Sequence, residues 1–343
     1  MRVAIAAAGT AAEIREAAAQ CQARGIGRLT VAETGADPFV QLAYAAPVAP
    51  DVELATGVAI AFARTPMTLA YAAWSLQDVS GGRSVIGLGS QIQAHIERRF
   101  AMPWSAPAAR MRDFILATRA IWAAWQDGAR LNYRGDFYAH TLMNPLFVPP
   151  ALAAGPPPIQ LAAVGPKMCE VAGSVADGLA THPFGSASYL RAEVLPIIER
   201  ARAAAVEAGA RHTARPFSVD AGVLIATGRD DAEIAEATAA VRGRIAFYGS
   251  TPAYLGVLAH HGRADVGPQL HALSVRGQWR EMAALVDDEL LHALAVVGDP
   301  ATCAAAIHER YAGVADVVTL NGSLAAPHAA LLDAAAALTR LAG

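Results

Sequence analysis

Residues that could do chemistry follow the second strand-like run of the chain. Glu33 and Thr34 come directly after Arg28–Ala32, at the point where a buried strand would end. A carboxylate in this position could orient a substrate or act as a general acid. It could also cap a helix or form a salt bridge, so both interpretations are kept.

A second candidate is the turn Gly165-Pro166-Lys167-Met168, which leads from a strand-like run into a helix. Free backbone N–H groups at the start of a helix, together with the helix dipole, favour an anion such as a phosphate. Lys167 is the one lysine of the chain and could add a positive charge. An ordinary strand-to-helix turn with a solvated lysine explains the same residues, and the sequence leaves both readings open.

Glycines mark a third place where a ligand could approach the backbone. The run Val52–Ile60 is apolar and β-branched, as expected of a strand buried on both faces. Thr65-Pro66 then predicts the start of a helix over Met67–Val79, and Gly81-Gly82 predicts its end. The next strand ends in Gly87-Leu88-Gly89-Ser90, where missing side chains would let a flat ligand approach the main chain.

Strand-like and helical segments alternate along the chain. We expect eight strands, near residues 2–6, 28–32, 52–60, 84–89, 159–163, 178–181, 217–226 and 316–320. This alternation predicts a parallel sheet with helices outside, and eight repeats favour a closed (β/α)8 TIM barrel. A dinucleotide-binding fold would need G-x-G-x-x-G after the first strand, whereas Gly87-Leu88-Gly89 follows a later strand and lacks the third glycine.

The active site of such a barrel lies at the C-terminal ends of its strands. That rule selects Glu33, Thr34, Gly57, Val58, Phe62, Arg64, Gly89, Ser90, Gln91, Val164, Gly165, Pro166, Lys167, Thr181, His182, Asn321 and Gly322. Tyr248 and Tyr254, with Trp104 and Phe247, could wall a substrate pocket or simply pack in the core.

Composition excludes several classes of protein. The chain has 343 residues, 54% of them hydrophobic, and a net charge of −3, which fits a compact enzyme and gives no basic stripe for nucleic acid. No apolar run reaches the length of a membrane span, and the first apolar stretch is too short for a signal peptide. We therefore expect a cytoplasmic protein without a membrane partner.

Metal and redox sites are not expected. Cys21, Cys169 and Cys303 are far apart and match no zinc or disulfide-exchange spacing. His260-His261 has no third ligand at metal spacing.

The stretch Val52–Ser90 resembles the bacterial luciferase-like monooxygenase superfamily, and within it the coenzyme F420-dependent oxidoreductases. The resemblance rests on the order and spacing of Thr56-Gly57-Val58, Arg64-Thr65-Pro66, Leu76-Gln77-Asp78-Val79-Ser80-Gly81-Gly82-Arg83 and Gly87-Leu88-Gly89. It implies one luciferase-like TIM barrel over residues 1–343, with residues 231–295 as a variable insertion at the rim that sets the substrate.

The resemblance also implies roles for the rim residues. Glu33 would be the catalytic residue, near the reactive face of a cofactor ring, and a cis peptide would fall at Gly57–Val58 behind that ring. The turn at 165–168 would hold the cofactor phosphate. The implied cofactor contacts are Thr34, Gly57, Val58, Gly89, Ser90, Gln91, Val164, Gly165, Pro166, Lys167, Met168, Thr181 and His182.

The implied activity is hydride transfer between reduced coenzyme F420 and a small organic substrate. An FMN-dependent two-component monooxygenase is the alternative because the two cofactors share ring shape and a phosphate, and a non-catalytic flavin-binding barrel is a third possibility. Family members often form homodimers, so a homodimer is expected. They also often carry histidine where this chain has Thr34, and no further basic set suits a phosphorylated sugar, so we do not expect a sugar-phosphate dehydrogenase.

Overall fold

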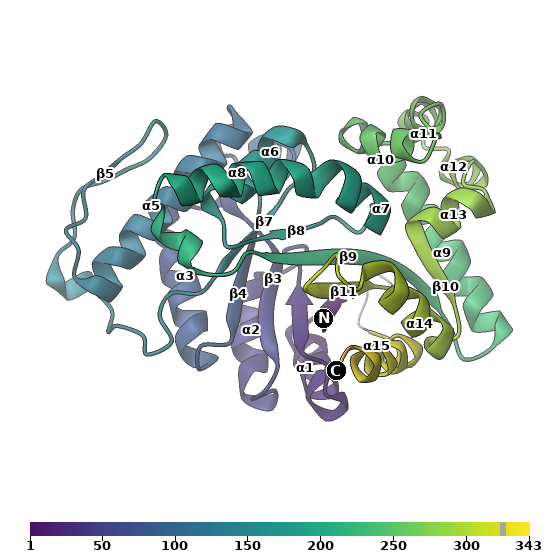
Figure 1. The fold of residues 1–343 in the computed structure, drawn as a ribbon, viewed down its shortest axis with the longest axis horizontal. Helices are drawn as coiled ribbons and strands as arrows, with labels where there is room; N and C mark the ends of the chain where they lie inside the picture. The colour runs from purple at the N-terminus through teal and green to yellow at the C-terminus, as the bar shows by residue number, and fades with distance from the viewer. Residues whose placement is uncertain (323–326) are drawn as a thin grey trace.

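Eight parallel strands close into a barrel in the computed structural model, which describes residues 1–322 and 327–343 (Figure 1). Each strand pairs with the next and the last pairs with the first, so the predicted (β/α)8 TIM barrel is confirmed. The barrel strands are β1 (Arg2–Ala7), β2 (Arg28–Val31), β3 (Glu53–Ile60), β4 (Ser84–Gly89), β7 (Ile159–Ala162), β8 (Gly178–Ala180), β9 (Ser218–Thr227) and β11 (Val317–Asn321).

Helices cover the outside of the barrel. Those that follow the strands are α1 (Ala11–Arg24), α2 (Pro38–Ala45), α3 (Pro66–Val79), α5 (Pro107–Asp127), α6 (Pro166–Val175), α7 (Ala187–Tyr189), α8 (Leu195–Glu207), α14 (Pro300–Tyr311) and α15 (Ala329–Ala342). A π-helical turn, Leu190–Val194, joins α7 to α8. Short 3-10 turns lie at Ala46–Val48, Ala61–Ala63, Pro145–Phe147, Arg211–Ala214 and Pro252–Tyr254.

Helix α3 begins and ends where its sequence predicts. The Thr65 hydroxyl accepts the Thr68 N–H, and Pro66 takes the first helical position, where no N–H is needed. Gly81 and Gly82 end the helix with φ of +64° and +87°, a region that other residues rarely adopt. These signals fix where β4 starts, and so where its C-terminal end reaches the rim.

Two elements lie outside the eight strands and the helix that the sequence analysis specified. A short helix, α4 (Gln93–Arg98), lies between β4 and α5. A ninth strand of the sheet, β10 (Ala295–Gly298), pairs with the far half of β9. A separate antiparallel hairpin around Gly135 is formed by β5 (Tyr133–Arg134) and β6 (Ala139–His140).

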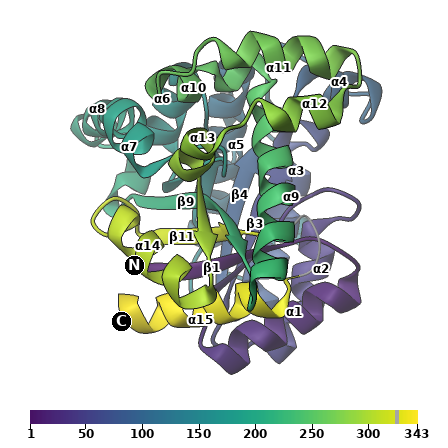
Figure 2. The same ribbon diagram turned by 90° about the vertical axis from the view of Figure 1, so that its right-hand side faces the viewer.

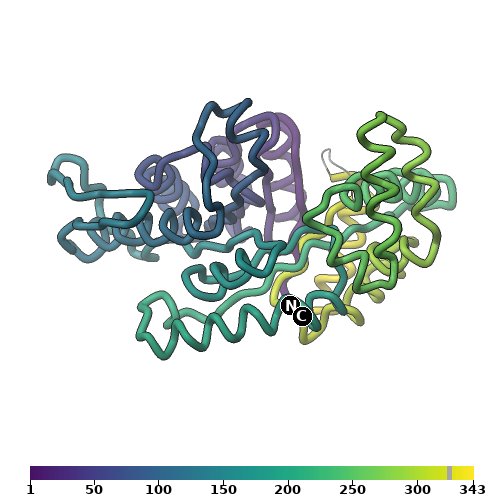
Figure 3. Tube along the Cα trace, turned by 90° about the horizontal axis from the view of Figure 1, so that it is seen from above, coloured from purple at the N-terminus to yellow at the C-terminus, as the bar shows by residue number. Residues whose placement is uncertain are grey.

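The segment between β9 and β10 forms a helical cap. Its helices are α9 (Asp231–Gly249), α10 (Leu255–His260), α11 (Val266–Val275), α12 (Trp279–Ala284) and α13 (Asp288–Leu294). They enclose a hydrophobic cluster of their own, which includes Phe184, Leu224 and Ile245. Figure 2 shows α10, α11 and α12 at the opposite end of the molecule from α1 and α15, and Figure 3 shows the cap beside the barrel, away from α5.

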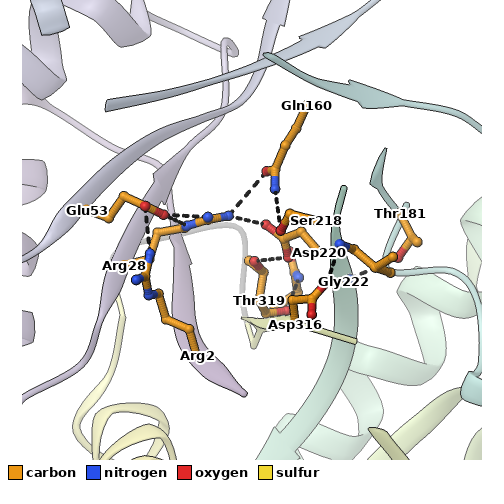
Figure 4. Close-up of polar contacts among 12 residues, drawn as sticks. Arg2, Arg28, Glu53, Gln160, Thr181, Ser218, Asp220, Gly222, Asp316 and Thr319 are labelled. Atoms are coloured by element: carbon orange, nitrogen blue, oxygen red, sulfur yellow. Dashed lines mark hydrogen bonds and ion pairs between the residues drawn. The ribbon is translucent and has the colours of Figure 1, made fainter. Parts of the chain in front are cut away.

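A buried ion pair crosses the inside of the barrel (Figure 4). Arg28 of β2 donates to Asp220 of β9 at 2.8 Å and to Gln160 of β7 at 3.2 Å, and it also pairs with Glu53 of β3. Thr319 of β11 donates to the other oxygen of Asp220 at 2.6 Å. Burial raises the pKa of Asp220, while Arg28 and the Thr319 hydroxyl oppose that rise. Five strands are thereby tied by side chains as well as by the main chain.

We expect Asp220→Ala to lower the free energy of unfolding by about 3 kcal/mol or more, because it leaves Arg28 buried without its fully buried partner. The control is Asp333→Ala, which breaks the exposed Arg229–Asp333 pair and should cost about 1 kcal/mol or less. Urea unfolding followed by circular dichroism measures both, and equal losses in the two variants would contradict the prediction.

Candidate active site

The ends of β2 and β3 meet at the rim of the barrel. The Gly57–Val58 peptide is cis, as the resemblance implied. The N–H of Glu33 donates to the Val58 carbonyl at 3.1 Å, which ties the loop after β2 to this peptide. Gly57 and Val58 are both partly exposed. The main chain of β3 therefore forms part of the barrel mouth.

The rim glycines have a packing reason of their own. A Cβ on Gly57 would lie 2.0 Å from Thr30 Cγ2, one on Gly87 would lie 2.0 Å from the Thr56 carbonyl oxygen, and one on Gly89 would lie 2.7 Å from Val58 Cγ2. Close approach between neighbouring strands thus requires glycine here. The sequence argument assigned the missing side chains to ligand access, and in the structure strand packing alone accounts for them.

The Glu33 carboxylate is held by two donors on one oxygen. Its Oε2 accepts the Ile60 N–H at 2.7 Å and the Arg64 guanidinium at 2.5 Å, and Arg64 also pairs with Asp37 at 2.7 Å. The side chain is only 10% exposed. Glu33 therefore forms the salt bridge that was one of its two interpretations. Its other oxygen, Oε1, has no hydrogen-bond partner within residues 1–322 and 327–343.

The loop after β4 lies beside the loop after β2. Ser90 donates to the Gln91 carbonyl at 3.1 Å, and Gln91 adopts a φ of +59° with its side-chain oxygen on the Ile92 N–H. Arg99, just after α4, donates to the Thr34 carbonyl at 2.7 Å. Ser90, Gln91 and Thr34 are thus brought to neighbouring loops of the rim, as the sequence analysis expected.

The predicted phosphate seat starts α6. Gly165 is exposed with a φ of −83°, and apart from its neighbours in the chain no heavy atom of the described residues lies within 4 Å of where its Cβ would be. Pro166 has no N–H to donate, and the Lys167 N–H has no main-chain acceptor in the described chain, whereas Met168 N–H donates back to Gly165. The seat therefore offers open space and a free amide, which fits a phosphate.

The Lys167 side chain lies away from the predicted phosphate seat. It lines a groove on the outside of the barrel, between α5, α6 and α8, together with Arg112 and Glu170. Val164 instead lines a small cavity of about 30 Å³ with Thr181, His182, Tyr189 and Tyr254. The structure thus places the backbone of the turn near the rim and the lysine side chain in a different groove.

His182 follows β8 and lies under the cap. Its Nδ1 accepts the Phe184 N–H at 3.0 Å, so the hydrogen of the neutral ring is on Nε2. Its ring centroid lies 4.5 Å from that of Tyr248 and 4.6 Å from that of Tyr254. Burial, together with the positive charge of Arg244, lowers the pKa of His182 to about 4. The imidazole is therefore a neutral hydrogen-bond donor at physiological pH.

The sequence analysis missed Arg244. This residue of α9 donates to the carbonyls of Asn321 and Gly322, at 3.3 and 2.7 Å, which bridges the cap to the end of β11. No motif singled it out, because it lies in the segment where the resemblance is weakest. An arginine spaced four residues before Tyr248 on one helix face was the available signal.

Other kinds of site find no support in the described parts of the chain. None of the helices there is long and apolar enough to cross a membrane. No group of three His, Cys, Asp or Glu side chains in residues 1–322 and 327–343 could hold a metal ion. All three cysteines are buried and free, and burial raises the pKa of Cys21 to about 12.

Comparison with known proteins identifies the family. The model of the luciferase-like monooxygenase family matches residues 2–316. The chain belongs to this family. An uncharacterized protein of Mycobacterium tuberculosis is 47% identical over 90% of this chain and 89% of its own length. The 5,10-methylenetetrahydromethanopterin reductase of Methanolobus tindarius is 29% identical, over 75% of this chain and 73% of its own.

Solved structures of other proteins share the fold. The coenzyme F420-dependent tetrahydromethanopterin reductase of Methanopyrus kandleri superposes with a TM-score of 0.77 at 19% identity, covering 99% of this chain and 96% of its own. The EDTA monooxygenase of Chelativorans superposes with a TM-score of 0.74 at 18% identity, covering 99% and 93%. At these identities the likeness establishes the barrel, and both reductases and monooxygenases use it.

We expect the His182 ring to titrate near pH 4 in the folded protein, because the buried neutral form is favoured. The unfolded chain then binds a proton that the folded chain does not, so the free energy of unfolding should fall as the pH drops from about 6.5 toward 4. NMR of the histidine Cε1–H signals, assigned with His182→Gln, measures the midpoint. A midpoint near 6.5, as in urea-unfolded protein, would contradict the assignment.

Proposed function

We propose that this luciferase-like protein is an F420-dependent oxidoreductase that transfers a hydride between the deazaflavin and a small organic substrate. The observation that carries the proposal is the sequence relationship to the Methanolobus tindarius reductase over three quarters of the chain. The enzyme of the same kind from Methanopyrus kandleri, which shares the fold, is described as coenzyme F420 dependent.

The residues at the rim fit a cofactor of this kind. The open space at Gly165 and the free Lys167 N–H would take its phosphate, with Val164, Pro166 and Met168 shaping the turn. The main chain of Gly57, Val58 and Gly89 would wall the ring, and the loops that carry Thr34, Ser90 and Gln91 would close its edge. Thr181 and His182 would lie next to the phosphate along the rim of the barrel. When bound, the deazaflavin supplies the hydride.

Glu33 would be the catalytic carboxylate of this site. Arg64 and the Ile60 N–H fix its orientation through Oε2, which leaves Oε1 to accept a hydrogen bond from the substrate or to carry a proton. His182 holds its Nε2 hydrogen at neutral pH and would act as a donor at the opposite side of the mouth. The other residues bind and orient, and none has to form a covalent bond to the substrate.

Two alternatives remain as competing proposals. The family is named for monooxygenases, and the EDTA monooxygenase shares the barrel, so an FMN-dependent two-component monooxygenase is the first. A non-catalytic flavin-binding barrel is the second.

We also propose that the protein forms a homodimer through the face of α2 and α3. Val40, Tyr44 and Tyr71 expose apolar surface on this face, and light scattering would test the oligomeric state.

A fluorescence titration of the purified protein with F420, and in parallel with FMN, tests the cofactor. We expect saturable binding of F420 at least tenfold tighter than that of FMN, followed by substrate-dependent hydride exchange. Preferential binding of FMN would move the protein to the monooxygenase branch, and binding without any turnover would favour the non-catalytic barrel. Binding of neither would remove the phosphate seat at Gly165–Met168.

We expect Glu33→Gln to reduce turnover by about a hundredfold or more, because proton transfer by a positioned carboxylate contributes a factor of that order. The Kd for the cofactor should change by less than about threefold if Glu33 serves the substrate. Asp37→Asn is the matched control, since it removes the other partner of Arg64 and keeps a residue suited to cap α2. Unchanged turnover in Glu33→Gln would exclude Glu33 from the mechanism.

A further inference from the structure

Arg244 presents a fixed positive charge at the mouth of the barrel. It extends from the cap helix α9, and its Nη1 donates to the carbonyls of Asn321 and Gly322 at the end of β11. Two acceptors on one nitrogen hold the guanidinium in place, one from Asn321 within β11 and one from Gly322 directly after it. The charge is thus part of the mouth and does not swing freely in solvent.

The guanidinium keeps one edge for a further partner. Its Nε is buried and has no hydrogen-bond partner within the part of the chain that the structure describes. Nε and Nη2 together form the side-on edge of an arginine, two parallel donors that match the two oxygens of a carboxylate. An unpaired buried donor is costly, so a ligand that satisfies it gains affinity.

The two arginines nearest to Arg244 in the sequence have carboxylate partners, and Arg244 has none in the described parts of the chain. Arg229 pairs with Asp333 at 2.9 Å, and Arg242 pairs with Asp288 at 2.6 Å. Arg244 has no ion pair with any carboxylate in residues 1–322 and 327–343, and its charge instead lies 5.8 Å from the ring centroid of Tyr248. A cation without a carboxylate partner at the mouth favours an anionic ligand.

The surroundings of Arg244 suit a planar organic anion. Tyr248 contacts both Arg244 and His182, and Tyr254 also packs on the His182 ring, with its centroid 6.4 Å from that of Tyr248. The three rings offer flat apolar surface, and the Nε2 hydrogen of His182 adds a neutral donor. The mouth therefore combines a two-donor cation, one neutral donor and aromatic walls.

We propose that Arg244 binds the carboxylate of the substrate and that this protein acts on organic carboxylates with a planar group beside the carboxylate. The inference rests on the proposed function, because it names the substrate class of that same site. Since Arg244 comes from the cap and the cofactor contacts come from the barrel, the cap sets the substrate through this residue.

Benzoate and benzamide are matched probes, since they share a planar ring and differ in charge. Ligand-observed NMR titrations of the whole protein should give a Kd for benzoate at least tenfold below that for benzamide. In Arg244→Gln that preference should disappear, while Arg229→Gln, which alters a solvent-exposed arginine with its own carboxylate partner, should keep it. Equal affinities, binding of neither probe, or a preference that survives Arg244→Gln would overturn the proposal.

Thermal melting of each variant serves as the control for loss of folding. Should Arg244→Gln melt early, Arg244→Lys decides, because lysine keeps the charge and loses the two-donor edge. It should reduce the preference for benzoate at least threefold, and an undiminished preference would overturn the proposal.

The F420 titration separates this proposal from the proposed function. The Kd for F420 should be the same in Arg244→Gln as in the unaltered protein, and a tenfold rise would assign Arg244 to the cofactor and overturn the substrate proposal. Failure of the unaltered protein to bind F420 would overturn the cofactor assignment, while the comparison of benzoate with benzamide would still decide whether the mouth binds a carboxylate.

Discussion

A buried ion pair between Arg28 and Asp220 lies inside the barrel, and it is the interaction on which the other elements depend. An arginine inside a parallel barrel must find acceptors on several strands at once, because no water replaces them. These acceptors come from three strands: Asp220 from β9, Gln160 from β7 and Glu53 from β3. Thr319 of β11 donates a hydrogen bond to the second carboxylate oxygen of Asp220. The registers of these strands are therefore constrained together, and with them the height at which each strand reaches the rim.

Strand β9 connects this polar interior to the cap. Its first residues pair with β8, and its last four pair with β10, which takes the place of β8 beyond the rim. The loop that carries Thr181 and His182 leaves the sheet at this change of partner, where the Thr181 hydroxyl accepts the Gly222 N–H at 2.9 Å. The position of His182 under the cap thus follows from the length of one strand.

Local signals in the sequence predicted much of the barrel. Thr65-Pro66 and Gly81-Gly82 bound α3 because caps and positive φ act within a few residues, and buried parallel strands are continuous apolar runs. Strand β10 was not predicted, because a short apolar run cannot be distinguished from the end of a helix until the strand with which it pairs is known.

The candidate site was predictable only in part, because its contacts join distant residues. Glu33 was singled out by its place after β2, but its partner Arg64 lies 31 residues away, and nothing local indicated that both bonds would fall on Oε2. Lys167 was assigned to the rim from its neighbours in sequence, whereas the packing of α6 against α5 and α8 places it in an outer groove. Arg244 depends on the fold of the cap, for which the sequence held no motif.

The change of partner along β9 also bears on how such enzymes diverge. The hydrogen-bond ladder that closes the barrel ends before the cap begins, so insertions and substitutions within residues 231–295 do not interrupt it. The cap helices could therefore be replaced without altering any strand pairing that closes the barrel. The closure of the barrel and the arrangement of the cap helices are thus physically separable within one chain.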